Sequence, residues 1–328
     1  MELNNKSLFK QECFIGGKWV NSISGETIEV ENPATQETIG IVPKCDAQET
    51  KTAIESANNA FKDWKNKTAK ERSIVLKIWH DLILENIDDL AHIMTVEQGK
   101  PLAEAKGEIL MGTTYIEFYA EEAKRVYGDI IPDPLPDRRI VVIKQPVGVI
   151  GAITPWNFPA AMITRKAGPA LAAGCPIVLK PASATPYTAT ALVELADRAG
   201  VPNGIINLLS GSARAIGGEM TENPTVRKLS FTGSTQIGKE LMAQCAGTIK
   251  KISLELGGNA PLIVFDDCDM EQAVRGAMAS KYRNAGQTCV CANRILVQDG
   301  VYDEFASLFA EAVGELQVGH GLREGVTQ

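Results

Sequence analysis

The sequence predicts an α/β protein built on a parallel sheet, and three observations support this. Short apolar runs of strand length alternate with helical patterns between Val147 and Leu256. The connections between them are short, which favours parallel strands with helices on both faces of the sheet. A similar strand–helix unit starts again near Gly257. We therefore expect a Rossmann-like domain with N-terminal helices over residues 1–256, and the first part of a second α/β domain over residues 257–328.

Composition argues against several classes of protein. The 328 residues are 45% hydrophobic and 22% charged, which is typical of a globular chain of about two domains. The net charge of −7 argues against a nucleic-acid partner. No apolar run approaches the ~18 residues of a membrane helix, and the N-terminus lacks the pattern of a secretory signal. Seven scattered cysteines favour the reducing cytoplasm, and three histidines without metal-ligand spacing argue against a metal site.

The first part of the chain predicts small strands followed by helices. Glycine and proline turns divide residues 13–42 into short strands. Helices are expected over residues 47–68, 70–98 and 102–126. In the helix expected over residues 70–98, apolar residues recur at steps of three and four, which places them on one face of the helix. We attribute the acidic residues of these helices to packing and to solvated faces.

A proline-rich turn and the strand-forming run Ile140-Val-Val-Ile143 follow these helices. They predict a projecting hairpin at about residues 127–146. Such a segment is more often an interaction surface than a catalytic one, so we expect it to join subunits.

The regular α/β part then begins. Strands are expected over residues 147–153, 176–180, 205–209, 227–231 and 250–256, and helices over residues 160–173, 186–199, 213–221 and 234–246. Thr185 is expected to cap the second of these helices, with Pro186 in its first turn. In the second domain, a strand over residues 261–265 and a helix over residues 270–282 lead to Cys289. Ligands of such sheets bind beyond the carboxyl ends of the strands.

Cys289 lies in the polar stretch Gly286-Gln-Thr-Cys289, between a helix and the strand-like run that begins at Arg294. A free thiol titrates near ~8.5, so it needs help from its surroundings to act as a thiolate at neutral pH. A small buried hydrophobe is the commoner role of a lone cysteine. The polar residues before Cys289 are unsuited to a packed core, and we therefore expect Cys289 to be a nucleophile.

Polar groups at the ends of two strands are candidates to act with this thiol. Asn157 could donate its side-chain amide to a developing oxyanion, worth ~3 kcal/mol, although a turn asparagine is the commoner interpretation. Glu255 lies inside an apolar strand, where an ionised carboxylate is costly to bury. It is therefore expected to be ion-paired, held neutral, or functional as a base that activates water.

Other strand ends suggest a cofactor and a charged substrate. The second strand ends in Lys180-Pro-Ala-Ser183 without an acidic residue, which leaves room and positive charge for a 2′-phosphate. Gly233 and Ser234 open a helix, a weak signal for phosphate binding. Arg165 and Arg283 could clamp a substrate carboxylate, although each could equally be a surface residue.

These pieces together resemble the aldehyde dehydrogenase superfamily, and the resemblance covers essentially the whole chain. It rests on the conjunction of four motifs: Thr154-Pro-Trp-Asn-Phe-Pro159, Phe231-Thr-Gly-Ser-Thr235, Leu254-Glu-Leu-Gly-Gly258 and Gly286-Gln-Thr-Cys289. Within the superfamily the chain is most similar to the NADP-dependent succinate-semialdehyde dehydrogenases. The residues that support this are Phe158-Pro-Ala-Ala-Met-Ile-Thr-Arg165-Lys, Lys180-Pro-Ala-Ser183 and Tyr282-Arg283-Asn-Ala-Gly-Gln-Thr-Cys-Val-Cys291.

The resemblance implies a role for each candidate. Cys289 would be the nucleophile and Glu255 the base, while Asn157 and the backbone N–H of Cys289 would form the oxyanion hole. Arg165 and Arg283 would hold the carboxylate of succinate semialdehyde or of a close ω-carboxy aldehyde such as glutarate semialdehyde. NADP, with NAD as a possible substitute, would be bound by Thr154, Pro155, Trp156, Lys180, Ala182, Ser183, Gly233, Ser234 and Leu256.

The resemblance also implies a mechanism and an assembly. A thiohemiacetal on Cys289 would collapse to a thioester, which water activated by Glu255 would release as the acid; no metal is required. Family members continue beyond the position of Gln328, so we expect the chain to be a fragment of an enzyme that is a homodimer or homotetramer at full length. An inactive, cofactor-binding fragment is the alternative. A cysteine hydrolase or acyl-transferase is less favoured, because no histidine lies in any motif.

Cys291 stands two residues from Cys289. An internal disulfide between them could switch the enzyme off reversibly, although poor geometry would strain it. A buried neighbouring thiol is the commoner interpretation.

Overall fold

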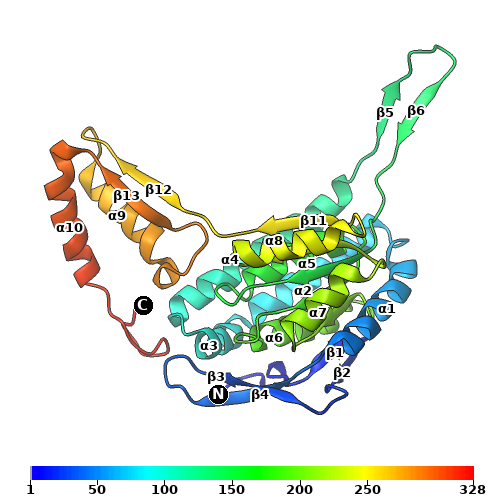
Figure 1. The fold of residues 1–328 in the computed structure, drawn as a ribbon, viewed down its shortest axis with the longest axis horizontal. Helices are drawn as coiled ribbons and strands as arrows, with labels where there is room; N and C mark the ends of the chain where they lie inside the picture. Colours follow the sequence, from blue (N-terminus) through cyan, green and yellow to red (C-terminus); the bar gives the residue numbers. More distant parts are fainter. Residues whose placement is uncertain (1) are drawn as a thin grey trace.

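The computed structural model describes residues 2–328 and contains a seven-stranded sheet, which lies between a front and a rear layer of helices in Figure 1. The strand order is β11-β10-β7-β8-β9-β1-β2. The strands from β11 to β9 are parallel, which confirms the predicted sheet, and β1 and β2 extend it in antiparallel orientation. The strands are β1 Cys13–Ile15, β2 Lys18–Val20, β7 Val149–Ile153, β8 Ile177–Lys180, β9 Ile206–Leu208, β10 Val226–Thr232 and β11 Lys251–Glu255.

Helices cover both faces of this sheet. In β8, Ile177 and Leu179 belong to a core shared with α2 to α6, whereas Val178 packs in a second core with α1, α7 and α8. This alternation is the period of two that a strand imposes on its side chains. The helices are α1 Ala47–Trp64, α2 Ala69–Glu85, α3 Ile87–Gln98, α4 Leu102–Glu122, α5 Ala161–Ala172, α6 Tyr187–Arg198, α7 Ala213–Glu222 and α8 Thr235–Ala246, and η2 Ala123–Arg125 extends α4.

The single helix expected over residues 70–98 is wrong, because the structure divides it into α2 and α3. Asn86 stands between them with φ −109° and ψ 20°. Its side-chain amide donates to the carbonyl oxygen of Leu82 at 2.8 Å, and its side-chain oxygen accepts from Asn5 at 3.0 Å. Asparagine competes with helical backbone hydrogen bonds in this way, so the chain turns at Asn86 although the apolar period continues.

The cap expected from Thr185 is also wrong. Pro186 precedes α6 and no local side chain caps the helix. The carboxylate of Glu97, on α3, instead accepts the backbone N–H groups of Tyr187 at 2.7 Å and Thr188 at 2.8 Å. Burial raises the pKa of Glu97 to about 8. A carboxylate distant in sequence therefore takes the place of the local cap, and the attribution of the acidic residues of α3 to solvated faces fails here.

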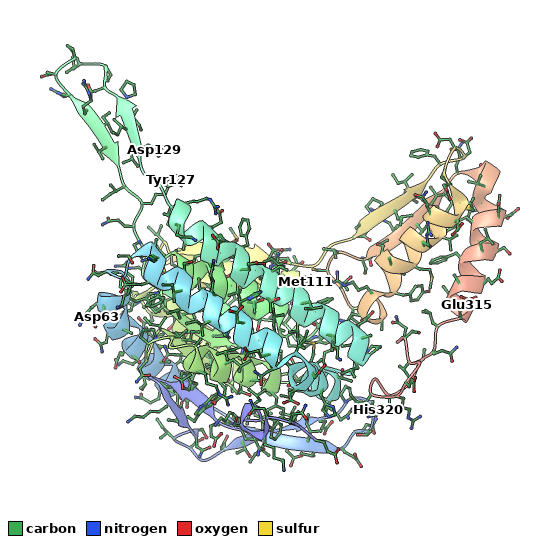
Figure 2. All side chains as sticks on the ribbon, turned by 180° about the vertical axis from the view of Figure 1, so that it is seen from behind. Asp63, Met111, Tyr127, Asp129, Glu315 and His320 are labelled. Atoms are coloured by element: carbon green, nitrogen blue, oxygen red, sulfur yellow. The ribbon has the colours of Figure 1, made fainter. Side chains whose placement is uncertain are left out.

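Two further parts extend from the sheet body. β5 Asp129–Pro132 and β6 Arg139–Val142 form an exposed antiparallel hairpin that projects from it in Figure 1, with Tyr127 and Asp129 near its base in Figure 2. On the other side lie the parallel strands β12 Ala260–Val264 and β13 Ala292–Val297, covered by α9 Met270–Tyr282 and α10 Tyr302–Gly314.

β3 Thr27–Glu31 and β4 Thr38–Pro43 form a separate hairpin near the N-terminus. The boundary near residue 257 and the subunit-joining role of the projecting hairpin stay predictions. Within residues 2–328, no helix combines the length and the apolar character needed to cross a membrane.

Candidate active site

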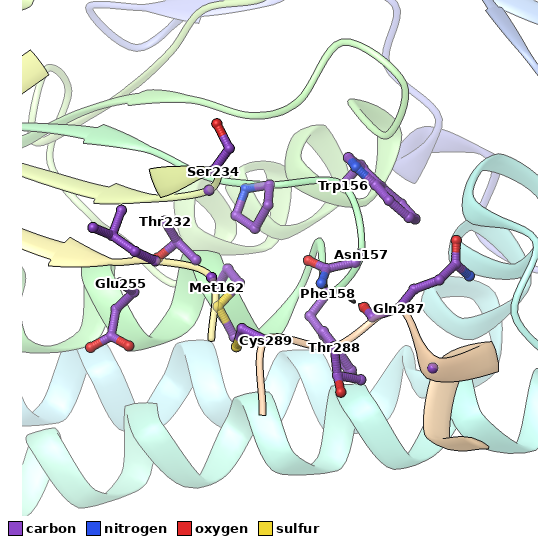
Figure 3. Close-up of a pocket in the computed structure, with 15 residues that line it drawn as sticks. Trp156, Asn157, Phe158, Met162, Thr232, Ser234, Glu255, Gln287, Thr288 and Cys289 are labelled. Atoms are coloured by element: carbon purple, nitrogen blue, oxygen red, sulfur yellow. Dashed lines mark hydrogen bonds between the residues drawn. The ribbon is translucent and has the colours of Figure 1, made fainter. Parts of the chain in front are cut away.

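The carboxyl ends of β7, β10 and β11 open into a cleft of about 380 Å³, drawn in Figure 3. From β7 the chain proceeds to β8 on one side, and later returns to β10 on the other side. Such a topological switch point leaves a crevice in which ligands of open parallel sheets bind. The cleft is lined by Pro155, Trp156, Asn157, Phe158, Met162, Thr232, Gly233, Ser234, Glu255, Leu256, Gly257, Gly286, Gln287, Thr288 and Cys289.

Cys289 is exposed and lies in the turn between η3 Arg283–Gly286 and β13. The backbone that leads to it is left-handed, with φ values of 51° at Asn284, 53° at Ala285 and 75° at Gly286. For a residue other than glycine, this conformation costs roughly 1–2 kcal/mol, so contacts from elsewhere must hold the turn. Glu104 of α4 supplies one, since it accepts the backbone N–H of Asn284 at 2.9 Å. In Figure 3, Cys289 lies between Glu255 and Asn157.

Asn157 follows β7 and directs its side-chain amide toward the turn that carries Cys289. The amide nitrogen donates to the backbone carbonyl oxygen of Gln287 at 2.7 Å. One of its two protons remains to donate to another group. Its side-chain oxygen is buried and has no hydrogen-bond partner among residues 2–328.

Glu255 is the last residue of β11, the edge strand of the sheet, and its side chain is exposed. The burial expected from its apolar neighbours is therefore wrong, because the side chains of β11 alternate: Ile252 and Leu254 pack against the core, and Glu255 lies on the opposite, exposed face. Glu255 lines the cleft and also a second hollow of about 470 Å³. Its carboxylate thus stands between two spaces that both admit water.

Lys166, which is absent from the residues predicted for the site, lines the second hollow together with Glu255. Its ammonium donates to the Ser230 hydroxyl at 3.0 Å. Burial lowers the pKa of Lys166 to about 8, and the Arg165 charge acts in the same direction. A lysine next to Arg165 on a helix looks like a surface residue in sequence, so no local signal could have found it.

The residues expected to bind the cofactor lie in and around two neighbouring hollows. Pro155, Trp156, Gly233, Ser234 and Leu256 line the cleft. Ser183 lines a neighbouring hollow of about 440 Å³ that shares Trp156 with the cleft. Lys180 is buried at the end of β8, donates to the carbonyl oxygen of Pro181 at 3.1 Å, and has its pKa lowered to about 8 by burial.

Thr154 and Ala182 complete the expected cofactor residues. Thr154 is buried directly after β7, and its backbone N–H donates to the Lys180 carbonyl oxygen at 3.1 Å. Ala182 is half-buried in the turn after β8. The hydroxyl oxygens of Thr154, Thr185 and Thr232 are buried without hydrogen-bond partners among residues 2–328. Such orphaned groups, next to a helix N-terminus at Ser234 and a buried ammonium at Lys180, fit a polar ligand that carries phosphate.

Arg165 and Arg283 do not line the cleft but lie behind one of its walls. This wall is a small apolar cluster of Phe158 and Met162 with Met111. The Arg283 guanidinium lies 5.1 Å from the centroid of the Phe158 ring and contacts the sulfur of Met111 at 3.5 Å. That of Arg165 contacts the sulfur of Met162 at 3.6 Å and faces the second hollow. Within residues 2–328 neither arginine forms an ion pair.

Cys291 is buried, and its thiol contacts the carbonyl oxygen of Gly286 at 3.3 Å. The described cysteines are all free. The redox role of Cys291 stays a prediction. Residues 2–328 contain no cluster of three or more side chains suited to a metal ion.

Comparison with known proteins adds to this geometry. Residues 19–328 match the model of the "Aldehyde dehydrogenase family". The chain is 64% identical over 327 residues to glutarate-semialdehyde dehydrogenase of Pseudomonas putida, an alignment that covers 100% of this chain and 68% of the relative. It is 62% identical over 327 residues to succinate-semialdehyde dehydrogenase [NADP(+)] of Escherichia coli, with the same coverage of 100% and 68%.

A solved structure agrees with these relatives. The crystal structure of an NADP-dependent enzyme of Escherichia coli superposes with a TM-score of 0.99 at 62% identity. The superposition covers 99% of this chain and 68% of that one. The described fold is therefore shared over its whole length.

Proposed function

The chain belongs to the aldehyde dehydrogenase family, and we propose that it oxidises succinate semialdehyde, or a close ω-carboxy aldehyde such as glutarate semialdehyde, with NADP. That it is an NAD(P)-dependent aldehyde dehydrogenase follows from the family and from relatives at 62% and 64% identity. The observation that carries the proposal is that Cys289, Glu255 and Asn157 line one cleft.

In the proposed mechanism Cys289 attacks the aldehyde carbon as a thiolate. The carbonyl oxygen becomes the oxyanion of a thiohemiacetal, and it accepts hydrogen bonds from the side chain of Asn157 and from the backbone N–H of Cys289. Such preorganised donors act where charge develops in the transition state. Collapse of the thiohemiacetal with loss of hydride leaves a thioester on Cys289. Glu255, which faces two hollows that admit water, then takes a proton from the water molecule that releases the acid.

NADP, when bound, supplies the hydride acceptor. The N-terminus of α8 at Ser234 and the buried ammonium of Lys180 would hold its phosphates. Ser183 leaves space for a 2′-phosphate that an acidic side chain at this position would repel. The orphaned hydroxyls of Thr154 and Thr232 support the assignment, since a bound polar ligand would satisfy them.

Arg165 and Arg283 would bind the distal carboxylate of the substrate. Their two guanidinium groups, which have no acidic partner among the described residues 2–328, flank the apolar wall formed by Phe158 and Met162. An aldehyde that lies along this wall with its carbonyl at Cys289 would bring its far end toward them. Charge-assisted hydrogen bonds from arginine then favour a carboxylate over an uncharged end.

We also propose that the projecting hairpin joins two copies of the chain. Its exposed apolar residues include Ile130, which is 75% exposed, and Val141, which is 66% exposed. A homodimer or homotetramer would bury them.

A steady-state assay tests the proposed reaction. Succinate semialdehyde, glutarate semialdehyde and uncharged aldehydes of matched length are compared, each with NADP and with NAD. The expected result is reduction of NADP that depends on an ω-carboxy aldehyde and is abolished in Cys289→Ser. Equal rates with uncharged aldehydes would refute the substrate class, and binding of NADP without turnover would favour the non-catalytic alternative.

A further inference from the structure

A buried ion pair lies behind the loop that carries Asn157. Lys100, in the turn between α3 and α4, reaches the carboxylate of Glu108 on α4 at 2.5 Å, and each side chain is 1% exposed. In each of the other ion pairs of the described residues, both side chains are at least 12% exposed. A fully buried ion pair contributes little net stability to a fold, because apolar side chains of similar volume often stabilise the folded state as well or better. Its presence therefore calls for an explanation other than stability.

Both members of the pair bind the segment that begins at Asn157. The Lys100 ammonium donates to the backbone carbonyl oxygen of Asn157 at 2.8 Å and lies 4.2 Å from the centroid of the Phe158 ring. The second carboxylate oxygen of Glu108 accepts the backbone N–H groups of Ala160 at 2.9 Å and Ala161 at 3.1 Å. The pair thus fixes this loop on both sides of Phe158.

The carbonyl oxygen of Asn157 has a second donor. The side-chain amide of Asn284 donates to it at 3.0 Å, and Asn284 opens the left-handed turn that leads to Cys289. Gln98, just before Lys100, donates to the side-chain oxygen of Asn284 at 3.2 Å. One carbonyl oxygen therefore joins the loop of the amide donor, the turn of the nucleophile and the segment between α3 and α4.

We propose that Lys100, held by Glu108, is a positioning residue that sets the side-chain amide of Asn157 relative to Cys289. The proposal rests on the proposed function, in which this amide stabilises an oxyanion. Lys100 touches neither the thiol nor the cleft; it acts through the backbone of Asn157. Without its ammonium, the Asn157 carbonyl keeps only the bond from Asn284, and the amide is free to shift away from the reacting oxygen.

The test removes the pair without leaving a buried charge. Lys100→Met combined with Glu108→Gln keeps the approximate shape, and glutamine still offers an oxygen to Ala160 and Ala161. The matched control is Lys106→Met, which removes an exposed ion pair between Lys106 of α4 and Asp88 of α3. We expect the double variant to lower kcat by about 30-fold or more, part of the ~100- to 1,000-fold that loss of a whole oxyanion donor costs.

Four further measurements separate positioning from general damage. In the double variant, the KM for the aldehyde, the Kd for NADP and the rate of Cys289 alkylation by iodoacetamide should stay within about threefold of wild type, because alkylation forms no oxyanion. Added to Asn157→Ala, the double substitution should cause no further loss of kcat.

The outcomes distinguish the positioning role of Lys100 from the oxyanion-binding role of Asn157. Wild-type kcat in the double variant, or losses that multiply with Asn157→Ala, overturn the positioning proposal and leave the role of Asn157 in place. Wild-type kcat in Asn157→Ala itself overturns both. Slowed alkylation in the double variant would show that the pair acts instead on the turn that carries Cys289, and would also overturn the proposal.

Discussion

The side-chain amide of Asn157 donates a 2.7 Å hydrogen bond to the backbone carbonyl oxygen of Gln287, two residues before Cys289. The bond joins the end of β7 to the turn that carries Cys289 across 130 residues of sequence. It holds the amide near the thiol and leaves one amide proton to donate elsewhere. The relation between these two segments underlies the proposed oxyanion hole.

Replacing Asn157 tests this hole directly. Asn157→Ala should lower kcat by about 100- to 1,000-fold with little change in KM, because the lost hydrogen bond acts on charge that develops only in the transition state. The measurement is steady-state kinetics with succinate semialdehyde and NADP. A kcat within about threefold of wild type would exclude the side chain from this role.

Arg283 should determine the preference for a carboxylated substrate. Arg283→Met should reduce kcat/KM for succinate semialdehyde by about 10- to 100-fold, since a charged hydrogen bond contributes roughly 1.5–3 kcal/mol. Turnover of butanal, which has no carboxylate, should change little. Arg275→Met is the matched control, because Arg275 is exposed and pairs with Glu271 on the outside of α9. Equal losses for both aldehydes would contradict a carboxylate contact.

The binding of NADP should weaken in alkaline solution. Burial lowers the pKa of Lys180 to about 8, so its ammonium is charged below this pH and neutral above it. A bound 2′-phosphate would favour the charged form. The Kd for NADP should therefore be nearly constant from pH 7 to 8 and then rise by up to about tenfold per pH unit.

Titration of the protein with both cofactors checks this dependence. The Kd for NAD, which lacks the phosphate, should stay flat over the same range. Lys180→Met should bind NADP more weakly at pH 7 and lose the alkaline rise. Parallel curves for the two cofactors would place Lys180 outside the phosphate site.

The part of the site that the sequence predicts depends on the parallel sheet. Once the alternation of strands and helices fixes that sheet, residues that follow different strands must meet at its carboxyl edge. Asn157, Gly233 and Glu255 come together in this way. The polar stretch before Cys289 predicts that this thiol faces a cleft, although the left-handed backbone of Asn284 and Ala285 has no counterpart in a sequence rule.

The rest of the site depends on contacts between residues far apart in the chain. In sequence, Lys100 lies between two expected helices and Glu108 lies on the second of them, and both look exposed to solvent; folding instead buries both against the loop of Asn157. Glu97 replaces the cap expected from Thr185 for the same reason. Local patterns report the period of an element and leave open which neighbour covers it.

A rapid-mixing experiment with Glu255→Gln tests the central claim, that Cys289 forms a covalent intermediate in the cleft it shares with Glu255 and Asn157. Without the base, the acyl group should remain on the enzyme after hydride transfer. Mixing the variant with succinate semialdehyde and NADP should give a burst of one NADPH per site, and mass spectrometry should find the succinyl thioester on the Cys289 peptide. No burst, or an adduct on any other residue, would contradict the account.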